Sequence, residues 1–333
     1  MHELRKDPIT GRWVIIASER ASRPTDFVID RQMPSGGTCP FCYGSEDRTP
    51  PEVLAYRPDT TPADTPGWRV RVVPNKYPAL RIEGLLGRRA AGMYDLMNAV
   101  GAHEVVIECP EHSSQLADLS TAEVTDVVRA YRDRFVDLKR DPRFRYILIF
   151  KNQGAEAGAT LEHAHTQIIA TPVVPKRVSE EIAGARQHFE QRERCIYCDI
   201  LHQEIDLGTR VVSRNEHFVV VAPFAARFPF ETWILPVEHT AYFEAIPAEQ
   251  VESLAAALRD TLRRIHSALD GPAFNYVLHT APTGGDRVDE TYHWHLEIMP
   301  KLTRVAGFEW GSGFYINPTP PEAAADVLRR AII

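Results

Sequence analysis

Two stretches of the chain place apolar residues at helical spacing. In the first, Ser120 and Glu123 form a capping-box pattern, and the positions that follow are Val124, Val127, Val128, Tyr131, Phe135 and Leu138. In the second, Pro247 can open a helix, and its apolar positions are Val251, Leu254, Leu258, Leu262 and Ile265. Each stretch predicts an amphipathic helix that packs one face against a core.

Runs of β-branched and aromatic residues surround both helices and predict strands. YILIFKN follows the first helix and FNYVLHT follows the second, at 146–152 and 274–280. After each comes a loop that contains glycine, then a His-x-His segment that predicts a further strand. A Cys-x-x-Cys pair and a histidine precede each helix. The same elements therefore occur twice in the same order, which predicts two copies of one α+β unit, each a mostly antiparallel sheet with helices packed on it.

A charged, helix-prone segment, PKRVSEEIAGARQHFEQRER, joins the two copies at 175–194. No low-complexity tract interrupts the chain. We therefore predict a catalytic N-terminal domain at 1–190 and a second domain at 191–333.

Charge and composition narrow the class of protein. The 333 residues are 44% apolar and 25% charged, as is ordinary for a globular protein, and the net charge is −7. A nucleic-acid binder would show a basic footprint instead. The first residues contain no apolar signal region, and no apolar run approaches the length of a membrane span. We expect a cytoplasmic protein with no nucleic-acid or membrane partner.

Four of the five cysteines form the pairs CPFC and CIYC, and the count is odd, which argues against a disulfide framework. Two thiolates and two imidazoles make a closed tetrahedral zinc site. The repeat predicts two such structural sites; their ligands are Cys39, Cys42, His112 and His163 in the first copy and Cys195, Cys198, His239 and His293 in the second. Each pair taken alone also fits buried free cysteines. A redox role is less favoured, because neither pair opens an obvious helix after a strand.

The segment LEHAHTQIIATP raises the question of catalysis. If 164–170 is a strand, His163, His165 and Gln167 share one face. A metal on His163 would orient His165 as a nucleophile. Asn152 and Gln167 are neutral donors that could flank a phosphate, and backbone at Gly154 and Gly158 can approach an anion closely. Arg20 and Arg23 are spaced to clamp phosphate oxygens. Each of these last features alone also fits an ordinary loop or surface.

Together these segments resemble a known family. DPITGRWVIIASERASRP, CPFC, VPNKYPAL, HEVVIECPEH, KNQGAEAGATLEHAHTQ, FPFETWILPVEH and YHWHLEIMPKL are similar, in order and over nearly the whole chain, to the galactose-1-phosphate uridylyltransferases, the nucleotidyltransferase branch of the histidine-triad superfamily. The resemblance implies two fused histidine-triad-like domains and a homodimer with shared sites. It also implies a ping-pong reaction in which His165 takes UMP from UDP-glucose and passes it to galactose 1-phosphate, with no organic cofactor.

The resemblance also assigns residues to roles. Gln167 and Asn152 would hold the α-phosphoryl oxygens. The expected substrate contacts are Arg20, Arg23, Phe41, Asn75, Tyr77, Gly158, Thr160 and Glu309. Family members often bind iron through a Glu and three His; here Glu181 and His279 match, but Glu297 and Met299 stand at the other two positions, so we do not expect iron.

Three departures keep other functions open. The nucleophile motif is His-Ala-His-Thr-Gln where the family usually has His-Pro-His-Gly-Gln. The second cysteine pair and GFEWGSGFYINP resemble the branch that contains ADP-glucose phosphorylase, which transfers AMP to phosphate. His295 is the counterpart of His165, but Glu297 follows it in place of glutamine, and we expect that half to lack catalysis. A zinc-stabilised nucleotide-binding protein without catalysis is the alternative from another class.

Overall fold

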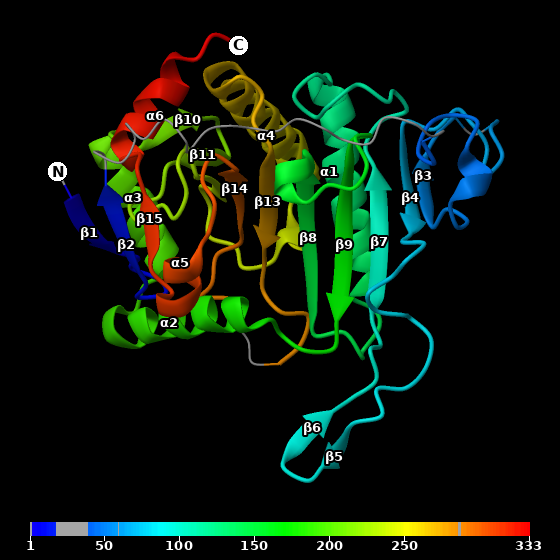
Figure 1. The fold of residues 1–333 in the computed structure, drawn as a ribbon, viewed down its shortest axis with the longest axis horizontal. Coiled ribbons are helices and arrows are strands. Elements are labelled where there is room, and N and C mark those ends of the chain that lie inside the picture. The colour runs from blue at the N-terminus through cyan, green and yellow to red at the C-terminus, as the bar shows by residue number, and fades with distance from the viewer. Residues whose placement is uncertain (1, 18–38, 59, 286–287) are drawn as a thin grey trace.

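The computed structural model describes residues 2–17, 39–58, 60–285 and 288–333. Its centre is a ten-stranded sheet in which every pair of neighbouring strands is antiparallel (Figure 1). From edge to edge the strands are β10 (Val211–Arg214), β11 (Phe218–Val221), β12 (Thr232–Pro236), β14 (His295–Pro300), β13 (Phe274–His279), β8 (Tyr146–Gln153), β9 (His165–Thr171), β7 (Ala102–Ile107), β4 (Val70–Pro74) and β3 (Leu54–Tyr56).

The sheet consists of two halves of identical strand order. From the outer edge inwards, the first half runs β3, β4, β7, β9, β8 and the second runs β10, β11, β12, β14, β13. The halves join where β8 pairs with β13 at the centre. This confirms the α+β class and the repeated, mostly antiparallel unit. The boundary at residue 190 stays a proposal; it falls in the last turn of α2 (Lys176–Arg192), the predicted connecting helix.

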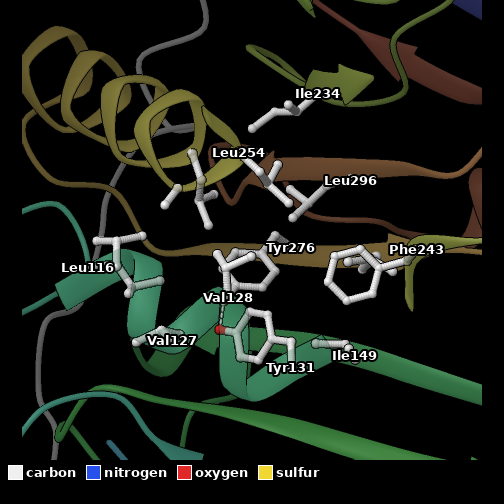
Figure 2. Packing of buried hydrophobic residues seen from close by; sticks show 14 of the residues in the cluster. Leu116, Val127, Val128, Tyr131, Ile149, Ile234, Phe243, Leu254, Tyr276 and Leu296 are labelled. Atoms are coloured by element: carbon white, nitrogen blue, oxygen red, sulfur yellow. Dashed lines mark hydrogen bonds between the residues drawn. The ribbon is translucent and has the colours of Figure 1, made fainter. Parts of the chain in front are cut away.

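Helices α1 (Thr121–Leu138) and α4 (Ala248–Leu269) cover one face of this sheet and contact each other. Both are confirmed where the apolar stripes predict them. Figure 2 shows Tyr131 of α1 pointing toward Tyr276 of β13, with Leu254 of α4 on the side of the same cluster where Leu296 of β14 lies. The core is therefore continuous across the two halves, because the helix of one copy packs on the helix of the other.

The opposite face of the second half is covered by α2 and by α3 (Ile196–Leu207), which packs on α2. The pair CIYC opens α3, since Cys195 is its N-cap. This helix was not predicted from the sequence. It follows α2 and not a strand, which differs from the arrangement of a thioredoxin-like site.

The chain ends form a second, smaller sheet. It contains β1 (His2–Lys6), β2 (Trp13–Ala17) and β15 (Tyr315–Asn317), and β15 runs parallel to β2. A two-stranded hairpin, β5 (Arg89–Ala91) and β6 (Tyr94–Leu96), extends away from the body of the molecule (Figure 1). The remaining elements are the short helices η2 (Glu46–Arg48), η3 (Ala155–Ala157), η4 (Phe243–Ala245) and α5 (Gly307–Ser312), and the helix α6 (Pro321–Arg330). None of the helices in the described ranges has the length and apolar character needed to span a membrane.

Candidate functional site

The first cysteine pair meets both predicted histidines. Cys39 lies just before η2, His112 follows β7, and His163 precedes β9. The Nδ1 atom of His163 lies 3.8 Å from Cys39 Sγ and 3.6 Å from Cys42 Sγ, and Nδ1 of His112 lies 3.4 Å from Cys42 Sγ. Bond lengths of about 2.3 Å for Zn–S and 2.0 Å for Zn–N put tetrahedral ligands roughly 3.5 Å apart. The four atoms therefore have the spacing of a tetrahedral metal site.

The hydrogen bonds of His163 also suit a metal ligand. Its Nε2 lies 2.8 Å from the carbonyl oxygen of Cys109, and a carbonyl can only accept, so Nε2 carries the proton. Nδ1 is then unprotonated and faces the two sulfurs. A backbone carbonyl on the distal nitrogen is the usual support of a metal-bound histidine.

The second cluster repeats this geometry. Cys198 Sγ lies 3.3 Å from His239 Nδ1 and 3.6 Å from His293 Nδ1, and Cys195 completes the group. The distal Nε2 atoms again donate to carbonyls, His239 to Asp289 and His293 to Pro236. The structure thus contains two Cys₂His₂ clusters able to hold a metal, each made of the four residues expected from the sequence.

His165 lies on the face of β9 opposite the core. Its neighbours Ala164 and Ile168 are buried under α1, whereas the ring of His165 packs edge-on against Phe41, with 5.5 Å between ring centroids. Its Nδ1–H donates to the carbonyl of His163 at 2.8 Å, which leaves Nε2 as the atom with a free lone pair. Burial lowers the pKa of His165, so the ring is neutral at pH 7. A neutral imidazole with a fixed tautomer has the state of a nucleophile.

A cavity of about 870 Å³ opens beside this ring. It lies on the sheet face opposite α1, and the exposed Tyr77 stands at its rim. Seven of the predicted residues line it: Phe41, Asn75, Tyr77, Gly158, Thr160, His165 and Gln167.

Two predicted contacts are placed outside the cavity lining, and two cannot be placed. Asn152 is on β8 next to Gly158 and points to the same face as Gln167, because its neighbour Phe150 pairs with Gln167; its Oδ1 accepts from Asn275 Nδ2 at 2.8 Å. Glu309 caps α5 outside the cavity lining, where its carboxylate accepts from the N–H of Ala306. Arg20 and Arg23 lie outside the described residues. Gly154, the other loop glycine, has a positive φ of 83° and precedes η3.

A buried ion pair lies beneath the nucleophile strand. Lys151 Nζ lies 2.7 Å from Glu108 Oε2 and donates to the carbonyl of His165 at 3.0 Å. The hydroxyls of Thr166 and Tyr131 donate to the same carboxylate. Sequence reasoning missed this pair, since a lysine in an apolar strand shows no partner until the strand order is known.

His295, the counterpart of His165 in the second half, is buried. His295 is 1% exposed and lies between the rings of His279, Trp233 and Tyr197 at centroid distances of 5.0–5.1 Å. No substrate phosphate could reach that ring without displacing these side chains. The expectation that this half lacks catalysis is therefore consistent with its packing.

The guanidinium of Arg227 lies beside Glu297 and Met299, the residues at two of the family's iron-ligand positions. Arg227 Nη2 lies 2.6 Å from Glu297 Oε2, 2.8 Å from Glu231 Oε1 and 3.4 Å from Met299 Sδ. Glu181, His279 and His295 also lie close enough to share a cation. Arg227 neutralises Glu297 but does not occupy the group of Glu181, His279 and His295, so the absence of iron stays a prediction.

The chain is similar to known proteins over nearly its whole length. Residues 1–175 match the galactose-1-phosphate uridyl transferase N-terminal domain, and residues 90–332 match a domain of unknown function, DUF4921. ADP-glucose phosphorylase of Arabidopsis thaliana is 40% identical over 98% of this chain and 92% of its own. Galactose-1-phosphate uridylyltransferase of Thermotoga maritima is 30% identical over 99% and 98%. The crystal structure of the Arabidopsis phosphorylase with bound ADP-glucose superposes with a TM-score of 0.87 at 38% identity, covering 100% of this chain and 99% of that one.

Fold and site together define a nucleotidyltransferase of two fused, repeated α+β units. The chain belongs to the galactose-1-phosphate uridylyltransferase family and is an enzyme of that family.

Proposed function

We propose that the protein transfers a nucleoside monophosphate from a nucleoside diphosphate glucose through a covalent nucleotidyl-His165. The observation that carries the proposal is the state of His165: its Nδ1–H is engaged by a carbonyl, and its ring lines the cavity with Nε2 unprotonated. Nε2 attacks the α-phosphorus, the bond to the bridging oxygen breaks, and glucose 1-phosphate leaves. An acceptor oxygen then attacks the same phosphorus and restores His165.

Charge on the non-bridging oxygens needs donors in this step. Gln167 lines the cavity, and Asn152 lies on the same sheet face, so their amide N–H groups are placed to donate. Phe41, Asn75 and Tyr77 are assigned to the base and ribose. Gly158 and Thr160 follow the loop at η3 and are assigned to the phosphates, as are Arg20 and Arg23.

Two donors remain candidates. UDP-glucose, with galactose 1-phosphate as acceptor, is the pair that the family resemblance implies, and the Thermotoga relative is named a galactose-1-phosphate uridylyltransferase. ADP-glucose, with phosphate as acceptor, is favoured by the higher identity and near-complete superposition of the Arabidopsis phosphorylase. One altered hydrogen bond to the base would be enough for the pocket to discriminate between UDP-glucose and ADP-glucose.

Zinc is the proposed metal of both Cys₂His₂ clusters. Two thiolates and two imidazoles per cluster leave no open position, so each zinc would be structural. Its role would be to tie the cysteine pair to the strand that carries His163 or His293, and in the first half thereby to hold His165 in place.

Two exposed apolar surfaces, one at the hairpin β5–β6 and one at α5, support the proposal of a homodimer. Leu85, Met93 and Tyr94 lie on or beside the hairpin β5–β6 and are 68–87% exposed. Among the described strands, β5 and β6 pair only with each other. Trp310 of α5 is 79% exposed. An isolated two-stranded hairpin is marginal in water, so a second copy is its natural support. Glu309 on α5 would then reach the partner's cavity.

The test uses purified protein and two donors labelled at the α-phosphate, UDP-glucose and ADP-glucose. The expected result is acid-labile, base-stable label on the wild-type chain from one donor and none on His165→Ala. Label from ADP-glucose alone assigns adenylyl transfer, and label from UDP-glucose assigns uridylyl transfer. Absence of label from both would refute the covalent mechanism and leave a zinc-stabilised nucleotide-binding protein.

A further inference from the structure

His103 lies between two parts of the cavity wall. It stands on β7, where Val105 pairs with Gln167 of β9, so His103 and Gln167 are diagonal neighbours on one sheet face. The Nε2 atom of His103 lies 2.8 Å from Gln167 Oε1 and 3.1 Å from Asn75 Nδ2. Its Nδ1 lies 3.1 Å from the backbone nitrogen of Ala79. The half-buried ring of His103 therefore contacts both the loop after β4 and Gln167, the residue proposed to donate to the substrate phosphate.

One of these contacts fixes the tautomer. The backbone N–H of Ala79 can only donate, so Nδ1 of His103 must accept and carries no hydrogen. In a neutral ring the hydrogen is then on Nε2, which has to find an acceptor. Gln167 Oε1 at 2.8 Å supplies it.

This hydrogen bond decides which way the Gln167 amide points. Since the oxygen faces His103, the NH₂ group faces away from it, and no described residue accepts from that nitrogen. Asn75 is oriented in the same sense: its Oδ1 accepts from the N–H of Tyr77 at 2.8 Å, so its NH₂ group adjoins a ring N–H and must direct its hydrogens elsewhere. Both amides line the cavity, so both present donors to it.

We propose that His103 is a positioning residue that holds the Gln167 amide with its NH₂ group toward the transferring phosphoryl group. The inference rests on the proposed function and adds to it. The terminal torsion of glutamine is broad and roughly two-fold. Without the ring N–H, the amide can turn over and present its oxygen to the phosphate oxygens, which repels the substrate at the point where negative charge grows.

The experiment measures the single-turnover rate of His165 labelling at saturating donor. Loss of a residue that orients a metal ligand typically costs about 10- to 100-fold in activity. By analogy, His103→Ala is expected to slow labelling by roughly that factor, with little change in donor affinity. In the Gln167→Ala background the same substitution is expected to change the rate by no more than about twofold, because its effect runs through Gln167. His202→Ala, an exposed histidine on α3, is the matched control for loss of an imidazole.

A conservative pair of variants covers the case in which His103→Ala does not fold. His103→Gln can place an N–H near the position of Nε2 and is expected to recover most of the rate. His103→Asn is too short to do so and is expected to remain slow. Wild-type rates in His103→Ala or His103→Asn, or losses that multiply with Gln167→Ala, would overturn the proposal. Wild-type rates in His165→Ala would instead overturn the proposed function, so the two failures are distinguishable.

Discussion

Two histidines separated by one residue carry different tasks because each uses Nδ1 differently. His163 turns Nδ1 toward two sulfurs, whereas His165 uses Nδ1–H to hold the carbonyl of His163. The first ring is fixed for a metal, and the second is thereby fixed with Nε2 free. The sequence motif alone shows the alternation of faces but cannot show which nitrogen is engaged.

This division predicts separable effects. His165→Ala is expected to reduce turnover by at least roughly a thousandfold, as loss of a nucleophile does, and to retain two zinc ions per chain. His163→Ala is expected to lose one zinc as well as activity. Metal analysis of the purified variants, together with turnover, checks both. Loss of zinc from His165→Ala would contradict the assignment.

The buried pair Lys151–Glu108 gives a stability prediction. Both side chains are at most 1% exposed, and Lys151 also supports the His165 carbonyl. Glu108→Gln would leave a buried ammonium without its counter-charge, a change that typically costs about 3–5 kcal/mol. Denaturant unfolding is the measurement, and Glu156→Gln on the exposed η3 loop is a matched control expected to change stability little. An unfolding free energy equal to that of the wild type would rule out a structural role for the pair.

At the scale of elements, the repeated helices and strands were predictable and several others were not. Apolar stripes and the Ser120 capping box located α1 and α4, and alternation located β9. Helix α3 was not predicted, because its first turn coincides with the Cys-x-x-Cys pair, a pattern that indicates a metal site and not a helix start. The His103 contact also escaped, since it depends on the register between β7 and β9, which no single strand encodes.

The capping box makes a quantitative prediction at the start of α1. Ser120 Oγ accepts from the N–H of Glu123 at 3.3 Å, and the Glu123 carboxylate accepts from the N–H of Ser120 at 2.7 Å. Ser120→Ala is expected to lower the unfolding free energy by about 1 kcal/mol. Ser120→Asp, another good N-cap residue, should restore most of it. Thermal or urea unfolding measures both variants; an unfolding free energy of Ser120→Ala equal to that of the wild type would contradict a stabilising cap.

The buried charges between α2, β13 and β14 predict a dependence of stability on pH. Burial alone would lower the pKa of His279, but Glu181 and Glu297 outweigh it and raise the pKa to about 9, against the opposing charge of Arg227. The folded pKa is above the unfolded value of about 6.5. Protonated His279 therefore contributes fully to the free energy of unfolding below about pH 6.5, and this contribution is lost as the pH rises through about 9. Unfolding free energies measured from pH 6 to 9.5 should fall more steeply for the wild type than for His279→Gln; parallel curves would contradict this.

At the scale of the whole molecule, the internal repeat of the sequence predicted a pair of similar units, and the structure shows how they join. The strand order of each half follows from its own pattern of strands and one helix. The pairing of β8 with β13 could not be predicted, because both strands are buried and their apolar pattern is compatible with several neighbours. The proposed homodimer contact could not be predicted either, because it depends on exposed side chains of the hairpin β5–β6 and of α5, outside the cores of both halves.

Removal of the hairpin tests that contact. Replacing residues 85–97 by a short Gly-Ser linker leaves the ten-stranded sheet intact, since β5 and β6 pair only with each other among the described strands. The shortened protein is expected to be monomeric by light scattering, to keep its zinc, and to lose turnover if Glu309 acts across the interface. A dimer of unchanged stability would exclude the hairpin as the contact.

The pairing of β8 with β13, which joins the two halves into one sheet, has a consequence for how the sequence of such an enzyme can evolve. Two separate identical subunits would share every mutation, so a substitution that closed one pocket would close both. Here the equivalent halves are encoded by different stretches of one gene and remain hydrogen-bonded as one sheet. Each half can therefore change independently: in the second, Trp233 and Tyr197 pack against His295, whereas in the first a pocket opens around His165.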